Sequence, residues 1–125
     1  MLDLAQANNS ARLEQIKLYI KCEALMNTMA EALSDSEEEY KQHPLAQEAN
    51  NSRIIVFEFI RSGEFNEDGL GDLYVDYKSD FESLLMRNEN DSQRTKFLDS
   101  LDKEIENCYA LNELQEDIIV RNKEK

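Results

Sequence analysis

The amino-acid sequence predicts an all-α fold: a compact helical bundle of about four to five helices, with long helices near both ends. Only three glycines and one proline interrupt 125 residues, so few positions break a helix. Hydrophobic residues make up 41% of the chain and charged residues 33%, which is typical of a helix-rich globular protein. Apolar residues recur at three- and four-residue steps, the period of an amphipathic helix. A chain of this length is expected to form one domain, spanning residues 1–125.

The first helix is expected to begin at Leu2 or Asn9 and to end at Leu33. Its apolar residues follow two lines, and an arc this wide predicts contact with more than one neighbouring helix. Ser34-Asp35-Ser36 is followed by three glutamates, which is typical of a helix stop and of a newly capped helix. This short helix should end near His43, because Pro44 disfavours helical geometry in the residue before it.

The segment from Pro44 to Ser62 contains a run, residues 53–61, that is rich in strand-favouring side chains. Its apolar residues nevertheless repeat at helical steps, no second strand is available for pairing, and Gly63 supplies a helix stop. We therefore expect a helix here and, from its apolar density, the most buried element of the fold.

Residues 63–71 are expected to form a loop, because they hold all three glycines. Asp72 would then cap a helix that reaches about Asn88. The stretch from Glu64 to Val75 partly matches a calcium-binding EF-hand loop, but Val75 stands where the closing glutamate is required. No calcium site is expected. The inward residues of this helix are Leu73, Tyr77, Phe81, Leu84 and Leu85.

The last long stretch, Ser92 to Arg121, is predicted to be one helix of roughly thirty residues, capped by Asp91 or Ser92. Residues 118–125 are expected to be a partly frayed tail. Glu104 and Asn112 fall into or beside the apolar arc, which indicates either contact with a second copy of the chain or a wet edge of the bundle. That arc consists of Phe97, Leu98, Leu101, Ile105, Cys108, Leu111, Leu114 and Ile118.

The formal net charge is -13, and residues 64–117 alone hold 16 acidic and 5 basic side chains. Such a charge opposes direct binding to nucleic acid or to anionic lipid, which requires Lys and Arg. Three aspartates stack at i, i+4 and i+8 although like charges at that spacing destabilise a helix, and more acids line one side of the final helix. The candidate partner-binding residues are Asp72, Asp76, Asp80, Asp99, Asp102, Glu106 and Glu113.

Motifs that carry catalysis or bind a cofactor are missing from the sequence. His43 is the single histidine, and it has no metal-ligand spacing to Cys22 or Cys108. Both cysteines lie in apolar stripes and are expected to be reduced thiols, and the alternative is a Cys22–Cys108 bridge. No apolar stretch is long enough to span a membrane and no signal peptide begins the chain, so a cytoplasmic location is expected. We expect no enzyme, no metal and no cofactor.

The charge pattern indicates a function in protein binding. The first hypothesis is a non-enzymatic module whose acidic half binds, and inhibits, a basic protein. Its sharpest form is a DNA mimic that occupies the site of a nucleic-acid-binding or defence protein. The alternative is a helical adaptor, or a homodimer, that docks through the apolar arc around Leu101 to Ile119.

Overall fold

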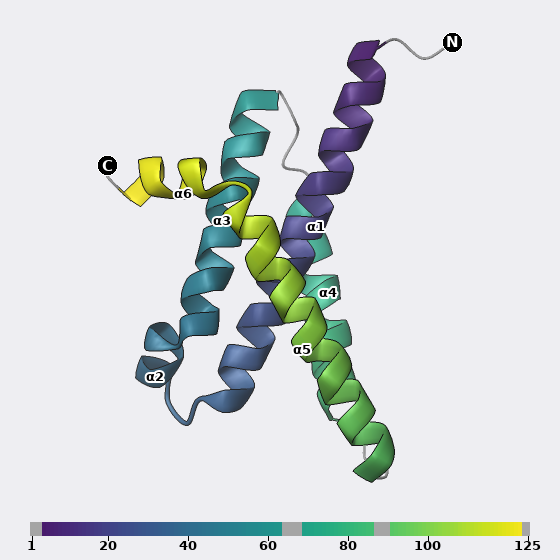
Figure 1. Ribbon diagram of the computed structural model, residues 1–125, viewed down its shortest axis with the longest axis vertical. Coiled ribbons are helices and arrows are strands. Elements are labelled where there is room, and N and C mark those ends of the chain that lie inside the picture. The colour runs from purple at the N-terminus through teal and green to yellow at the C-terminus, as the bar shows by residue number, and fades with distance from the viewer. Residues whose placement is uncertain (1–3, 64–68, 87–90, 124–125) are drawn as a thin grey trace.

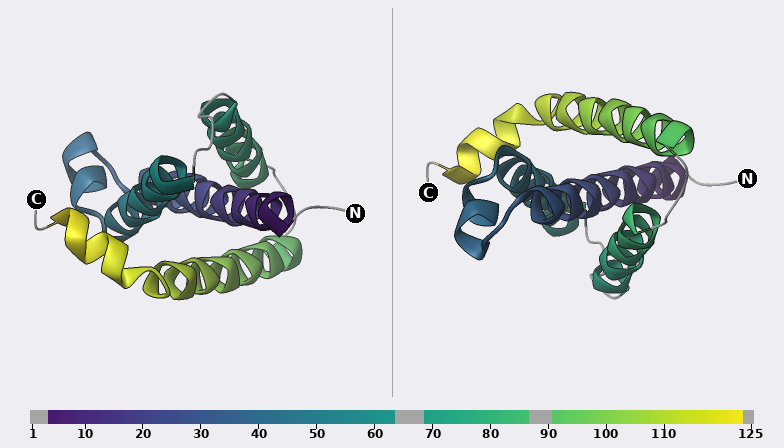
Figure 2. Two further views of the ribbon diagram at one scale, coloured as in Figure 1. Left: turned by 90° about the horizontal axis from the view of Figure 1, so that it is seen from above. Right: turned by 90° about the horizontal axis from the view of Figure 1, so that it is seen from below.

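Helix α1 runs through the middle of the molecule, and the other helices pack around it (Figures 1 and 2). The computed structural model describes residues 4–63, 69–86 and 91–123. Every element assigned within these residues is a helix, which confirms the predicted all-α class. The helices are α1 (Leu4–Leu33), α2 (Glu37–Gln42), α3 (Pro44–Gly63), α4 (Leu70–Leu85), α5 (Asp91–Glu113) and α6 (Glu116–Lys123).

The most buried element is α1, whereas the sequence had indicated α3. Helix α3 buries one face and leaves Arg53, Phe57 and Arg61 exposed, while α1 contacts α3, α4 and α5 on different sides. This confirms the wide contact arc predicted for the first helix. The buried residues of α1 are Ile16, Tyr19, Ile20, Cys22, Ala24, Leu25, Met26, Thr28 and Ala30.

The helix boundaries between α1 and α3 follow the predicted capping chemistry. The Oγ of Ser36 accepts a hydrogen bond from the backbone N–H of Glu39 at 3.1 Å, and this caps α2. His43 has extended backbone geometry before Pro44, and its Nδ1 accepts the backbone N–H of Leu45 at 3.1 Å. Pro44 opens α3, which runs as a helix through the residues with strand propensity.

Helix α4 begins after Gly69, whose φ of 84° lies in the left-handed region that favours glycine. Asp72 was predicted to cap this helix, but it lies inside the first turn, where its charge complements the helix dipole. Residues 64–68 and 87–90 lie outside the described residues. They include the first five positions of the EF-hand-like stretch and the expected end of this helix near Asn88.

The predicted single C-terminal helix is wrong, because α5 ends at Glu113 and α6 begins at Glu116. Leu114, which sits in phase with the apolar arc, is 76% exposed in the turn between them. The turn redirects α6 across α3, where Ile118 and Ile119 join the core beside Ile55 and Phe59 (Figure 1). Within the tail predicted to be partly frayed, residues 118–123 are helical in α6, and residues 124–125 lie outside the described residues.

The two cysteines form a disulfide, which corrects the expectation of reduced thiols. Cys22 of α1 and Cys108 of α5 are bonded with their Cα atoms 5.5 Å apart. Each was placed correctly in an apolar stripe, and the fold brings the two stripes face to face around Met26 and Ala49. The bridge joins residues that are 86 positions apart and pins α5 onto α1.

Candidate interaction surface

The first candidate acidic surface lies on α4 and consists of Asp72, Asp76 and Asp80. We call it the α4 face. All three residues are exposed and follow the i, i+4, i+8 spacing along the helix. The neighbouring side of α4 packs onto the rest of the chain through Phe81, which is 8% exposed. These aspartates therefore lie beside the packed side of α4, in contact with solvent.

The second candidate surface lies on α5 and consists of Asp99, Asp102, Glu106 and Glu113. We call it the α5 face. All four are exposed. The opposite side of α5 carries Leu101 and Cys108, which are 4% and 5% exposed and face the core. Helix α5 is thus amphipathic, as the sequence predicted.

The two faces do not form a single continuous surface. Both views along the molecule place α4 and α5 on opposite sides of α1 (Figure 2). The seven candidate residues therefore form two faces, each on its own helix.

None of the seven carboxylates takes part in an ion pair within the described residues. The ion pairs found there are Lys17–Glu14, Lys41–Glu37, Arg61–Glu58 and the pairs of Lys78 with Glu31 and Glu82. Lys78 lies on α4, but its Nζ is 2.7 Å from Glu31 and 2.9 Å from Glu82, so it is not directed to the α4 face. Partial burial disfavours its charge, yet hydrogen bonds to these two carboxylates raise the pKa of Lys78. The acids of both faces are therefore not ion-paired with any described lysine or arginine.

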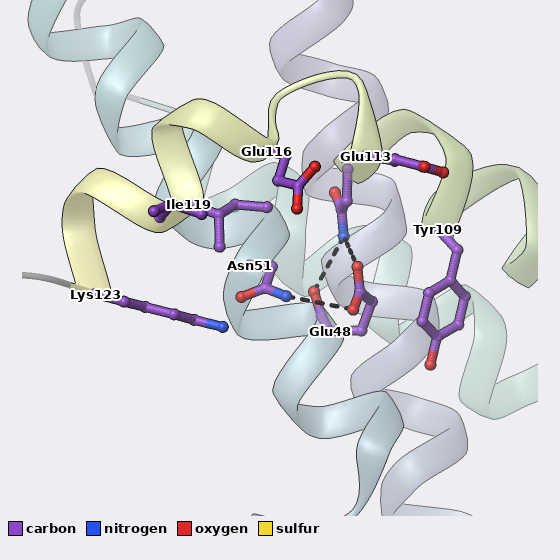
Figure 3. A pocket seen from close by; sticks show the side chains of 9 residues that line it. Glu48, Asn51, Tyr109, Glu113, Glu116, Ile119 and Lys123 are labelled. Atoms are coloured by element: carbon purple, nitrogen blue, oxygen red, sulfur yellow. Dashed lines mark hydrogen bonds between the residues drawn. The ribbon is translucent and has the colours of Figure 1, made fainter.

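An open cleft of about 420 Å³ borders the α5 face between α3, α5 and α6 (Figure 3). Glu48 lies at its centre, Glu116 projects into it from α6, and Glu113 points away from Glu48 (Figure 3). Tyr109 and Val120 contribute an aromatic and an aliphatic wall. Lys123 of α6 also lines the cleft, so its three carboxylates are opposed by one cation of the same chain (Figure 3). Carboxylates beside such walls suit the long stem and charged head of a lysine or arginine side chain.

Glu48 is held in place by two asparagines. The Nδ2 of Asn112 donates to Oε1 of Glu48 at 2.9 Å, and the Nδ2 of Asn51 donates to its Oε2 at 3.3 Å (Figure 3). Partial burial, followed by the negative charge of Glu48, raises the pKa of Tyr109. Glu48, Tyr109 and Glu116 were not among the predicted site residues, because only the break between α5 and α6 brings them together.

Asn112, the polar residue predicted to lie beside the apolar arc, is buried within the chain and hydrogen-bonded to α3. It is 1% exposed, it accepts a hydrogen bond from Ser52 Oγ at 2.8 Å, and it donates to the backbone carbonyl of Glu48 at 3.2 Å. The arc therefore faces α1 and α3 of the same chain. The apolar face from Leu101 to Ile119, proposed for an adaptor or a homodimer, is largely covered, since Leu101, Cys108, Ile118 and Ile119 are all buried.

A polar network lies on the side of α1 that contacts α2 and α4. Tyr40 donates to Oδ1 of Asn27 at 2.8 Å, and Nδ2 of Asn27 donates to the hydroxyl of Tyr74 at 2.9 Å, so the network links α2, α1 and α4. Nearby Glu23 lines a small cavity together with Arg53. Burial raises the pKa of Glu23 to about 7, although the charge of Arg53 opposes the shift.

Metal and thiol chemistry find no site in the described part of the chain. No group of three or more acidic, histidine or cysteine side chains is arranged there to hold a metal ion. Both cysteines are bonded to each other, so neither is a free thiol for nucleophilic catalysis. Among the described helices, none has a stretch apolar and long enough to cross a membrane.

Comparison with known proteins adds no relative to this description: no family model, no curated protein and no solved structure matches the chain.

Proposed function

We propose that this chain is a non-enzymatic cytoplasmic module that binds and inhibits a basic protein through the α4 and α5 faces. The observation that carries the proposal is the state of the seven carboxylates, which are exposed and unpaired with any described lysine or arginine. Lone exposed carboxylates in helical rows attract a basic partner at long range and fix its register on contact.

In its sharpest form the proposal is DNA mimicry. The acids would stand in for phosphates, and the partner would be a nucleic-acid-binding or defence protein whose basic groove is then closed to DNA. The cleft beside Glu113 supports this form, because Tyr109 and three carboxylates line it against one cation, Lys123, so it stays net negative toward a basic side chain of the partner.

A charge-reversal experiment tests the proposal. The test variant carries Asp76→Lys, Asp80→Lys, Asp102→Lys and Glu106→Lys. The control variant carries four reversals away from the two faces, Glu14→Lys, Asp35→Lys, Glu37→Lys and Glu38→Lys. Both variants change the formal charge from -13 to -5, so they differ only in where the acids are lost. Helical circular dichroism verifies that each variant is folded.

Each protein is used to capture partners from the lysate of the source cell at about 50 and about 500 mM salt. We expect the wild type and the control to capture the same basic protein at low salt, the test variant to lose it, and high salt to weaken capture steeply. For DNA mimicry, a duplex oligonucleotide must displace the captured protein. Equal capture by the test variant would refute the role of the faces, and capture insensitive to salt would favour apolar docking.

A further inference from the structure

Helix α5 is held to the rest of the chain at three levels. At its C-terminal end, Asn112 is buried against α3, and the hydroxyl of Tyr19 donates to the carbonyl of Leu111 at 2.6 Å. One turn before Asn112, Cys108 is bonded to Cys22 of α1. Near the middle of the helix, Leu101 packs with Leu25 and Phe81.

Residues 98–107 of α5 have few other buried side chains. Between residues 98 and 107, Leu101 alone is buried, Glu104 and Ile105 are partly buried, and the other residues are exposed. In Figure 1, α5 crosses in front of α1 and its N-terminal half diverges from the lower half of α1. The C-terminal half is better secured, because α6 adds Ile118 and Ile119 to the core on α3.

The disulfide borders an open surface groove. Both cysteines line a groove of about 180 Å³ between α1 and α5, together with Leu18, Lys21 and Asn107. Each cysteine is 5% exposed, so the bond is largely buried and lies at the floor of the groove. The groove is the route by which a small reductant would reach it, because thiol–disulfide exchange begins with direct attack on a sulfur.

We propose that the Cys22–Cys108 bond is a reducible latch. When a dithiol reduces it, residues 98–107 of α5 separate from α1, while Asn112 and α6 keep the C-terminal end of α5 on α3. This segment carries Asp99, Asp102 and Glu106, so the latch sets whether most of the α5 face is rigid or mobile.

The exchange is balanced by the dithiol. One of its thiolates attacks a cysteine sulfur, the S–S bond of the protein breaks, and the other cysteine leaves as a thiolate that takes up a proton. The second thiolate of the dithiol then attacks the dithiol sulfur of the mixed disulfide, that S–S bond breaks, and the first cysteine leaves as a thiolate that takes up the second proton. Two electrons and two protons reach Cys22 and Cys108, and the dithiol becomes a cyclic disulfide.

Reduction of the full-length chain by dithiothreitol without denaturant tests the latch. Alkylation and mass measurement count the free thiols, and amide hydrogen exchange follows each helix. We expect both cysteines to be alkylated, and exchange across residues 98–107 to accelerate by about tenfold or more. Exchange across residues 44–63 and 116–123 should stay within about twofold of the oxidised protein. Reoxidation should restore slow exchange.

The double variant Cys22→Ser, Cys108→Ser should reproduce the exchange pattern of the reduced protein and should not respond to dithiothreitol. Three outcomes would overturn the latch: resistance of the bond to reduction without denaturant, unchanged exchange on α5 after reduction, or accelerated exchange over every helix, which would make the bond a global staple. None of these measurements uses a partner protein, so failure of the latch is distinguishable from failure of the proposed binding.

Discussion

At the scale of single residues, Glu23 makes the stability of the fold depend on pH. Burial raises the pKa of its carboxyl group to about 7 in the folded chain, against an ordinary value of 4.5. The folded state therefore binds this proton more tightly than the unfolded state does. The resulting stability is fully present below about pH 4.5 and is lost as the pH rises toward 7.

Glu23→Gln removes this dependence, because the amide stays neutral at every pH. At pH 8 the variant should be more stable than the wild type by about 1–3 kcal/mol, and the difference should vanish near pH 4.5. Urea unfolding across this pH range measures it. Glu14→Gln, an exposed substitution on the same helix, serves as the control and should change stability by less than about 0.5 kcal/mol. A constant difference between Glu23→Gln and the wild type would contradict the assignment.

Single residues also show which features of the structure could be predicted from the sequence. Asn112 was recognised as a polar group beside an apolar arc, but periodicity places a side chain on a face without saying what covers that face. Its partners, Ser52 and Glu48, lie more than 50 positions away, in a helix whose position relative to α5 is fixed only by tertiary packing. The roles of Ser36 and Pro44 could be predicted from the sequence, because capping and proline geometry act within a few residues.

At the scale of elements, the break between α5 and α6 is the main feature that the sequence concealed. Residues 114 and 115 are leucine and glutamine, neither of which stops a helix, and Leu111, Leu114 and Ile118 continue the apolar period across the break. A weak signal was present, since Glu116 and Asp117 are acids suited to the first turn of a new helix. The break is favourable because it moves Ile118 and Ile119 onto α3.

Ile119→Ala tests this explanation. Ile119 is 8% exposed in the cluster of α1 and α3 residues, so its truncation should cost about 2 kcal/mol in urea unfolding and should speed amide exchange across residues 116–123. Val120→Ala lies on the same helix at 44% exposure and should cost less than about 0.5 kcal/mol. Equal effects of the two substitutions would mean that α6 is not held by its buried side.

At the scale of the whole molecule, the segregation of charge was predictable and the pairing of helices was not. All seven candidate acids are exposed as expected, because amphipathic period alone decides which side of a helix is wet. Their division into two faces depends on α1 lying between α4 and α5 (Figure 2). The disulfide depends on the same packing, since two distant cysteines in apolar stripes bond only if the stripes meet.

The acidic faces should oppose folding, because like charges that are not ion-paired with a described cation repel one another in the compact state. Replacing Asp76, Asp80, Asp102 and Glu106 with their amides should therefore stabilise the protein by about 1–2 kcal/mol at roughly 20 mM NaCl, since several exposed charge contacts of up to about 1 kcal/mol each are relieved. At about 500 mM NaCl the gain should largely disappear, because salt screens the same repulsion in the wild type. Urea midpoints at the two salt concentrations measure both effects.

The same amide variant should lose capture of the basic partner while gaining stability, which is the pattern of a surface kept for binding at the expense of folding. Matched amides at Glu14, Asp35, Glu37 and Glu38 should give no stability gain, because Glu14 and Glu37 already pair with lysines and the other two lie near the start of α2. If the amides on the two faces instead destabilise the protein, the carboxylates support their own helices, and the rows of acids are then explained without any partner.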